Sequence, residues 1–243
     1  MQALQQGEYS LGKEFQMKYD NITHAIFLRR PNRFIAEVEL DEKEERVHVK
    51  NTGRCRELLV PGCEVWLTAP GTPGRKTKYD LVAVRKADGV LYNIDSQAPN
   101  KVVKEWLQEQ DYCRIVPEYS YGDSRVDFYM EKDIGEAEPQ RFLMEVKGCT
   151  LEIDGIGYFP DAPTIRGVKH IRELIKAKKE GYHAILAFVI QMDGVNEVRP
   201  NTDTDPEFGK AMEEALTEEV EVIFFTCHVE PDRLVIAERR SKA

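Results

Sequence analysis

The first third of the chain alternates between short apolar runs and polar turns. Pro31-Asn32, Asn51-Thr52-Gly53 and Pro61-Gly62 divide it into strand-sized pieces, because Asn, Gly and Pro supply the backbone angles of tight turns. The strand-like runs are residues 25–30, 33–40, 45–50, 63–69 and 79–85. Five short strands in so few residues predict a small closed barrel, with a plain five-stranded sheet as the alternative.

Beyond residue 98 the hydrophobic period changes. Residues 99–108, 164–179 and 206–216 place apolar side chains three and four positions apart, which is typical of amphipathic helices. In the second of these, Gly181 follows the last apolar position and marks the end of the helix. The strand-like runs between and after the helices are residues 114–119, 125–131, 141–147, 184–191, 221–229 and 233–238. This order predicts a mixed sheet flanked by helices.

The two patterns meet at a polar turn, Lys86-Ala87-Asp88-Gly89. We therefore predict two domains, residues 1–88 and residues 89–243. The first is expected to be a five-stranded β-barrel of the oligonucleotide-binding (OB) type with a role in DNA binding. The second is expected to be an α/β domain with a mixed central sheet, so the fold class is mixed α+β.

Composition narrows the class of protein. The net charge is −9, with +1 in residues 1–96 and −10 in residues 97–243, which mildly disfavours nonspecific nucleic-acid binding. The longest apolar run, residues 184–190, is far shorter than the ~20 residues of a membrane span. The first residues, MQALQQGEYS, lack a signal pattern, so we expect a cytoplasmic protein without membrane contact. The five cysteines have no zinc or redox spacing and are expected to be reduced thiols.

The segment FLMEVKG, residues 142–148, places charge inside an apolar strand. Glu145 and Lys147 share one face because side chains alternate along a strand. Burial of isolated charges on that face would be costly. Asp127 lies in the preceding apolar run, and residues 132–140 predict a hairpin that brings the two carboxylates together. Carboxylates and the carbonyl oxygen of Val146 would suit Mg²⁺ or Mn²⁺. Lys147 would then position or deprotonate a water, or stabilise phosphate charge.

Other residues could extend this site. Glu105 and Glu118 are candidate outer metal ligands, although each could equally be a solvated surface charge. The Glu145–Lys147 pair itself could be a salt bridge on a half-exposed sheet. Asp161 and Gln191 are candidate supporting residues, with a helix cap and a strand-terminal turn as the alternatives.

Basic residues form three candidate DNA-contacting groups. Arg54 and Arg56 follow a predicted turn and could bind phosphates, with a plain turn about as favoured. A second loop could grip the backbone while its tyrosine stacks a base, or form a solvated hairpin tip; it contains Arg75, Lys76, Lys78 and Tyr79. The third group begins the helix of residues 164–179, where helix amides favour anions, and consists of Arg166, Lys169 and His170.

The order Asp127, then Glu145-Val146-Lys147, resembles the acid, gap, acid-x-lysine signature of the restriction-endonuclease-like (PD-(D/E)xK) nucleases. The wider sequence resembles the sugar fermentation stimulation protein A family of prokaryotes. The matching blocks are residues 33–39, 51–54, 57–62, 75–79, 122–128, 145–147 and 159–170. The resemblance implies an OB barrel, a restriction-endonuclease-like second domain, DNA binding and a link to the regulation of sugar use.

Three functions remain open at this stage. The leading hypothesis is a DNA-binding protein with an Mg²⁺- or Mn²⁺-dependent nuclease site at Asp127, Glu145 and Lys147, acting on single- or double-stranded DNA without strong sequence specificity. The first alternative is a noncatalytic DNA-binding regulator of sugar-metabolism genes that uses the nuclease-like fold as a scaffold. The second alternative is a protein that binds a small ligand. The sequence does not indicate the oligomeric state.

Overall fold

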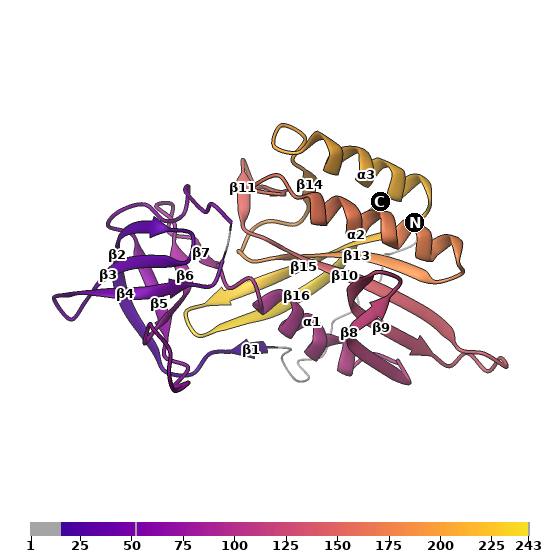
Figure 1. Cartoon of the computed structure of the whole chain (residues 1–243), viewed down its shortest axis with the longest axis horizontal. Coiled ribbons are helices and arrows are strands. Elements are labelled where there is room, and N and C mark those ends of the chain that lie inside the picture. Colours follow the sequence, from indigo (N-terminus) through magenta and orange to yellow (C-terminus); the bar gives the residue numbers. More distant parts are fainter. Residues whose placement is uncertain (1–15, 52, 243) are drawn as a thin grey trace, which may run out of the picture.

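The structure is a computed structural model that describes residues 16–51 and 53–242. Figure 1 shows two parts side by side, a β-barrel and a larger layered domain. The barrel strands are β2 (Ile22–Asn32), β3 (Ile35–Leu40), β4 (Lys43–Val49), β5 (Glu64–Thr68), β6 (Asp80–Arg85) and β7 (Leu91–Asn93). All five strands expected in this region are present, and β7 is an addition.

Strand pairing closes the N-terminal sheet. Its order is β4-β3-β2-β5-β6-β7, and a further pairing of β4 with β6 closes the first five strands of this order into a barrel. The closed barrel is therefore confirmed, and the plain sheet is excluded. Strand β2 is longer than expected because its first half pairs with β5 and its second half with β3. One long coiled strand thus serves both sides of the barrel.

The second domain is built on a seven-stranded mixed sheet in the order β1-β16-β15-β13-β10-β9-β8. Strands β10, β13 and β15 run parallel to one another, and the remaining pairs are antiparallel. The predicted mixed sheet is confirmed. The strands are β1 (Gln16–Lys18), β8 (Arg114–Tyr121), β9 (Ser124–Lys132), β10 (Gln140–Cys149), β13 (His183–Ile190), β15 (Glu221–Glu230) and β16 (Arg233–Ser241).

Helices cover both faces of this sheet. Helix α1 (Ala98–Gln108) packs against one face, and helices α2 (Ile165–Lys179) and α3 (Pro206–Thr217) pack against the other. In β13, Phe188 belongs to the core under α2 and α3, whereas Val189 belongs to the core under α1. A strand buried on both faces reads as a continuous apolar run, which explains residues 184–190. No helix in the described part of the chain is long and apolar enough to cross a membrane.

Each of the two large sheets contains a strand from the other side of the predicted domain boundary at residue 88. Strand β7 continues the barrel sheet to Asn93, and β1, which precedes the barrel in sequence, pairs with β16 at the edge of the second sheet. A small third sheet, absent from the sequence prediction, consists of β11 (Leu151–Ile153), β12 (Ile156–Phe159) and β14 (Val198–Pro200). The division into two units remains a prediction. The chain passes between the units twice, after β1 and after β7.

Candidate metal centre

Asp127 and Glu145 lie on neighbouring antiparallel strands where the two strands begin to separate. The regular register of β9 and β10 ends at the pair Phe128 and Met144, so the next opposed positions are Asp127 and Glu145. The backbone amide of Val146 donates to Oδ2 of Asp127 at 2.8 Å. A carboxylate therefore satisfies a main-chain donor at the point where the ladder ends. The predicted hairpin does bring these two acids together.

Glu145 is buried, and its two carboxylate oxygens have different surroundings. Oε1 accepts hydrogen bonds from Nζ of Lys147 and from Nδ1 of His170. Burial alone would raise the pKa of this carboxyl, but the hydrogen bond from His170 and the charge of Lys147 outweigh burial and lower the pKa. Oε2 is buried and has no hydrogen-bond partner among the described residues. Since a buried unpartnered oxygen is costly, Oε2 is the oxygen of Glu145 that a bound cation would stabilise.

Burial and the neighbouring Glu145 both shift the pKa of the Asp127 carboxyl. Its pKa is raised first by burial and then by the negative charge of Glu145. The Val146 amide, the charge of Lys147 and a hydrogen bond of 2.6 Å from Nδ2 of Asn100 to Oδ1 oppose that shift. Two carboxylates that repel each other across a small gap form a favourable position for a hard cation.

The donor set fits a cation that keeps part of its water shell. Within residues 16–51 and 53–242, no group of three or more His, Cys, Asp or Glu side chains is arranged to hold a metal ion. The side-chain ligands at this site are therefore limited to the two carboxylates, and the carbonyl of Val146 remains the third predicted ligand. Mg²⁺ commonly uses one or two carboxylates and retains several waters, so the set suits Mg²⁺ or Mn²⁺ better than a soft metal.

His170 supports Glu145. Its side chain is buried, Nδ1 bonds the Glu145 carboxylate, and Nε2 accepts a hydrogen bond of 3.2 Å from Nε of Arg166. Because Nε2 is an acceptor, the ring proton lies on Nδ1 and is donated to Glu145. The predicted DNA contact at His170 is revised for this reason: both ring nitrogens are already engaged inside the protein. Through its hydrogen bond to Nε2, Arg166 fixes the orientation of the His170 ring.

The structure does not bring either candidate outer ligand to the carboxylate pair. Glu118 has a positive φ of 50° and points into solvent, where Nη1 of Arg125 bonds it at 2.8 Å. Glu105 is five residues from Asn100 on α1, so it lies about 140° around the helix from the side chain that contacts Asp127. Asn100 is the residue that sequence reasoning missed. Its signal was a polar side chain directly after the apolar pair Ala98 and Pro99 that begins the helix.

The basic candidates lie in different surroundings. Arg54 and Arg56 line a cavity of about 300 Å³ on the barrel together with Arg30 and Arg33. Arg30 holds the loop above this cavity by donating to four main-chain carbonyls, those of Arg33, Asn51, Gly53 and Arg54. Because the Nη atoms of Arg30 are already bonded, the guanidinium groups of Arg33, Arg54 and Arg56 remain around this cavity, and they are suited to phosphate.

The second basic loop is partly occupied by internal contacts. Arg75 forms an ion pair with Asp80, and Nζ of Lys78 stands 4.8 Å from the ring centre of Tyr79. A base that stacked on that face of Tyr79 would have to displace Lys78. Lys76 is exposed. On α2, Lys169 is exposed and pairs with Glu173 at 3.6 Å. Lys76, Lys78 and Lys169 therefore remain available for phosphate contacts.

Asp161 and Gln191 lie at the junction of the two parts. Oδ2 of Asp161 accepts a hydrogen bond of 2.8 Å from the backbone amide of Arg54 across the junction. Nε2 of Gln191 donates to Oδ1 of Asn93 at 2.9 Å and to the carbonyl of Asp95 at 3.1 Å. Thr164, not Asp161, caps α2 by accepting from the amide of Gly167. Both residues thus connect the barrel to the strand ends beside the carboxylate pair.

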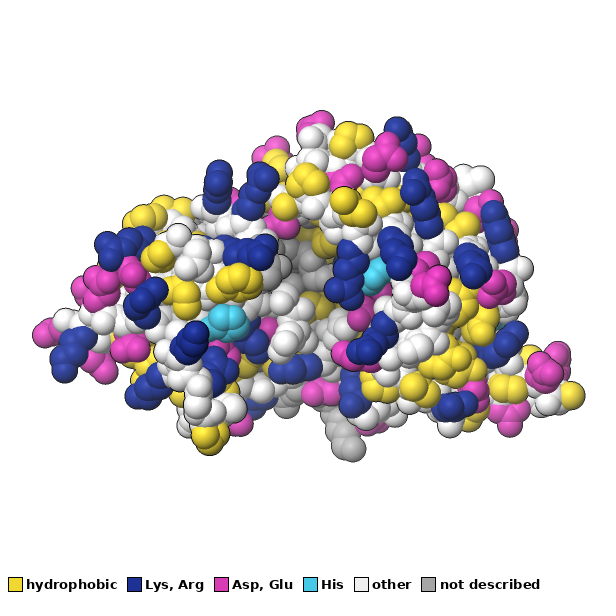
Figure 2. Space-filling model, in the orientation of Figure 1, with side chains coloured by type: hydrophobic (Ala, Val, Ile, Leu, Met, Phe, Trp, Pro, Cys, Tyr) yellow, Lys and Arg dark blue, Asp and Glu magenta, His cyan; other side chains and the backbone are white. Residues whose placement is uncertain are grey.

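This junction is visible on the surface. Figure 2 shows one face of the molecule hollowed between the two parts, with Lys and Arg side chains on both sides of the hollow. A polar cavity of about 210 Å³ lies at the junction, and its lining includes Asp161, Gln191 and Gly148, the residue that follows Lys147. The cavity therefore lies between β10, the strand that carries Glu145 and Lys147, and the barrel loop that contains Asn51 and Gly53.

Comparison with known proteins identifies relatives over nearly the whole length. The SfsA N-terminal OB domain model matches residues 28–94, and the model of the sugar fermentation stimulation protein RE domain matches residues 97–233. The sugar fermentation stimulation protein homolog of Desulfitobacterium hafniense (strain DSM 10664 / DCB-2) is 48% identical over 221 residues, which cover 90% of this chain and 94% of that protein.

Two further relatives agree with this result. The homolog of Clostridium perfringens (strain 13 / Type A) is 49% identical over 225 residues, which cover 90% of this chain and 96% of that protein. The solved structure of Pyrococcus furiosus SfsA in complex with Ca²⁺ superposes with a TM-score of 0.81 at 31% identity and covers 94% of this chain and 98% of that one. The similarity therefore extends over both the barrel and the layered domain.

Proposed function

The chain belongs to the sugar fermentation stimulation protein family, and we propose that it is a cytoplasmic, divalent-metal-dependent nuclease that binds DNA and hydrolyses phosphodiester bonds. One observation carries the proposal. Oε2 of Glu145 is buried beside Asp127 and has no hydrogen-bond partner in the described part of the chain, while Lys147 is held against the other oxygen of the same carboxylate. Two acids and a lysine in this arrangement match the needs of phosphodiester hydrolysis.

The protein groups have separate roles in this proposal. Asp127, Glu145 and the carbonyl of Val146 would hold Mg²⁺ or Mn²⁺, and the ion would lower the pKa of a bound water and neutralise phosphate charge. Lys147 donates from its ammonium toward the attacked phosphate and stabilises the negative charge that develops there. His170 and Asn100 keep the two carboxylates oriented through their hydrogen bonds. The Ca²⁺ bound to the Pyrococcus furiosus relative supports a divalent-cation site in the family.

Contacts with the sugar-phosphate backbone would provide most of the DNA affinity. The arginines around the barrel cavity and the exposed lysines at positions 76, 78 and 169 are suited to phosphate oxygens. Phosphate contacts fix the position of the nucleic acid and carry little sequence information. We therefore expect binding that depends strongly on salt and only weakly on sequence.

The test is a cleavage assay with labelled single- and double-stranded DNA across an Mg²⁺ and Mn²⁺ titration. The wild type is compared with the double variant Glu145→Ala, Lys147→Ala. A matched control is Glu238→Ala, Arg240→Ala, which removes an acid and a base at the same spacing from an exposed strand ion pair. Cleavage by the wild type and the control, with loss in the site variant, is the expected result. Binding by all three without cleavage would instead favour a noncatalytic DNA-binding regulator.

A further inference from the structure

The cavity at the domain junction lies beyond Lys147 along β10. Gly148 lines the cavity and directly follows Lys147 on β10, so the two positions are separated by about 3.3 Å along the strand. Other lining residues come from the barrel loop and from the segment before α2, including Asn51 and Asp161. The cavity therefore exists only when the barrel and the second domain are together.

Two glycines allow its walls to approach closely. A Cβ atom at Gly148 would lie 2.8 Å from Cγ of Pro99 and would also collide with Oε1 of Gln191. A Cβ atom at Gly53 would lie 2.8 Å from Oδ1 of Asn51 and would collide with the Asp161 carboxylate. Side chains at these positions would force the walls apart. The compact shape of the cavity therefore depends on both glycines.

The chemistry of the walls differs from that of a phosphate site. None of the described residues that line this cavity is Lys or Arg, whereas four arginines line the cavity on the other side of Gly53. The junction cavity instead offers the hydroxyl of Thr150, the ring of Tyr158 and the carboxylate of Asp161. Oδ2 of Asp161 accepts from the Arg54 amide, and no described residue donates to Oδ1. Oδ1 is thus a free acceptor in a polar, partly aromatic cavity.

We propose that this cavity binds a single unstacked nucleobase of the strand whose phosphodiester lies at Asp127 and Glu145, a proposal that rests on the proposed nuclease function. A carboxylate acceptor favours the exocyclic amines of adenine, cytosine and guanine over thymine, whose one ring N–H donor lies between two carbonyl oxygens that repel the carboxylate. Phosphates flanking that base lie toward Lys147 on one side and toward the barrel arginines on the other. Because a paired base cannot enter such a cavity, the substrate class is DNA with an unpaired base beside the cleaved bond, as in single strands and frayed ends.

The test uses single nucleotides and requires no cleavage. Deoxyadenosine, deoxycytidine, deoxyguanosine and thymidine 5′-monophosphates, and deoxyribose 5-phosphate, are titrated into the full chain without added metal by calorimetry. The three nucleotides with amine-bearing bases should bind about tenfold more tightly than thymidine monophosphate, as expected for one hydrogen bond to a charged acceptor. Equal affinities for all five ligands would overturn the proposal.

A substitution then assigns the acceptor. Asp161→Asn keeps an oxygen for the Arg54 amide but loses the carboxylate, so the tenfold preference should disappear. Asp203→Asn, at an exposed carboxylate in the turn before α3, is the matched control and should retain the preference. A preference that survived Asp161→Asn would overturn the assignment.

The outcome is separable from that of the nuclease assay. Base-selective binding without any DNA cleavage would retain the cavity proposal and reject the nuclease. Cleavage without base-selective binding would retain the nuclease and reject the cavity.

Discussion

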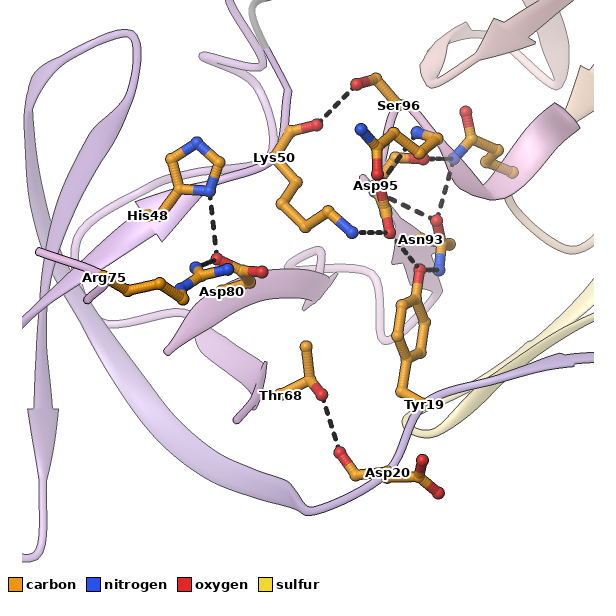
Figure 3. A network of polar contacts seen from close by, with 12 residues as sticks. Tyr19, Asp20, His48, Lys50, Thr68, Arg75, Asp80, Asn93, Asp95 and Ser96 are labelled. Atoms are coloured by element: carbon orange, nitrogen blue, oxygen red, sulfur yellow. Dashed lines mark hydrogen bonds and ion pairs between the residues drawn. The ribbon is translucent and has the colours of Figure 1, made fainter. Parts of the chain in front are cut away.

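Asn93 and Gln191 form a reciprocal pair that joins the barrel to the second domain. Nε2 of Gln191 donates to Oδ1 of Asn93 at 2.9 Å, and the backbone amide of Asn93 donates to the carbonyl of Gln191 at 3.0 Å. Both residues are fully buried, at 0% and 1% exposure. In Figure 3, Asn93 belongs to a network in which Nζ of Lys50 and the hydroxyl of Tyr19 both reach the buried carboxylate of Asp95. The junction therefore combines this buried polar network with apolar packing, since both apolar core clusters include residues of the barrel and of the second domain.

Replacement of Gln191 should weaken this junction. Gln191→Ala leaves Asn93 and the Asp95 carbonyl without a buried donor, so we expect a loss of about 1–3 kcal/mol in the free energy of unfolding. Urea unfolding followed by tryptophan fluorescence measures the change. Gln108→Ala, at an exposed position of α1, is the control and should change stability by less than about 0.5 kcal/mol. Equal stability of the two variants would contradict a role for Gln191 in holding the domains.

A divalent cation should stabilise the wild-type protein in the absence of DNA. At a free concentration of 100 Kd, one bound ion contributes about 2.7 kcal/mol, which corresponds to roughly 5–10 °C in Tm for a chain of this size. Differential scanning fluorimetry with Mn²⁺, followed by excess chelator, measures this shift. Glu145→Gln removes a ligand charge and should lose the shift, whereas the surface variant Glu238→Gln should retain it. A shift of equal size in Glu145→Gln would place the cation elsewhere.

The raised pKa of Asp127 predicts a particular pH dependence of stability. The folded protein holds a proton on Asp127 at pH values where the unfolded chain has lost it, because burial and then Glu145 raise the pKa above its ordinary value of 3.8. Stability contributed by this group is full below that value and is lost as the pH rises through the folded-state pKa. Without metal, Asp127→Asn should therefore gain stability relative to the wild type as the pH rises from 3.8.

Chemical unfolding of both proteins across this pH range checks the sign. Asp203→Asn provides the control for a carboxylate at an exposed position. If the stability difference between Asp127→Asn and the wild type stayed constant with pH, the pKa of Asp127 would not be raised by burial and by Glu145.

The barrel arginines should determine the salt dependence of DNA binding. If Arg54 contacts one phosphate, Arg54→Gln should reduce the slope of log K against log salt by about 0.9, and Arg56→Gln should have a similar effect. Fluorescence anisotropy with labelled DNA at several salt concentrations measures the slope. Arg199 lies on β14 and forms a surface pair with Glu197, and Arg199→Gln should leave the slope unchanged. An identical slope in all variants would exclude the barrel cavity as a phosphate site.

Much of this structure could be read from local pattern. Alternation and turn residues located every strand of the closed barrel, and the apolar stripe located α2 from Ile165 to Lys179. The continuous apolar run of residues 184–190 predicted β13. The charged residues inside the apolar run of residues 142–148 identified Glu145 and Lys147 as candidates. Each of these depends on residues a few positions apart, because strand and helix periods are short and repeat along the chain. The sequence by itself therefore determined the three helices, the five barrel strands, six strands of the second sheet and the acid-x-lysine set, but not β1, β7 or the small third sheet.

Contacts between distant residues were decided only by the tertiary structure. The closure of β4 on β6, the pairing of β1 with β16 and the approach of His170 to Glu145 join segments whose local patterns carry no information about each other. The same holds for Asn100 on Asp127 and for the cavity beside Gly148. Whether a carboxylate is free, paired or repelled depends on burial and on charges brought from elsewhere in the chain. For this reason the candidate ligands could be predicted from the sequence, but their protonation, their supporting partners and the adjoining cavity could not.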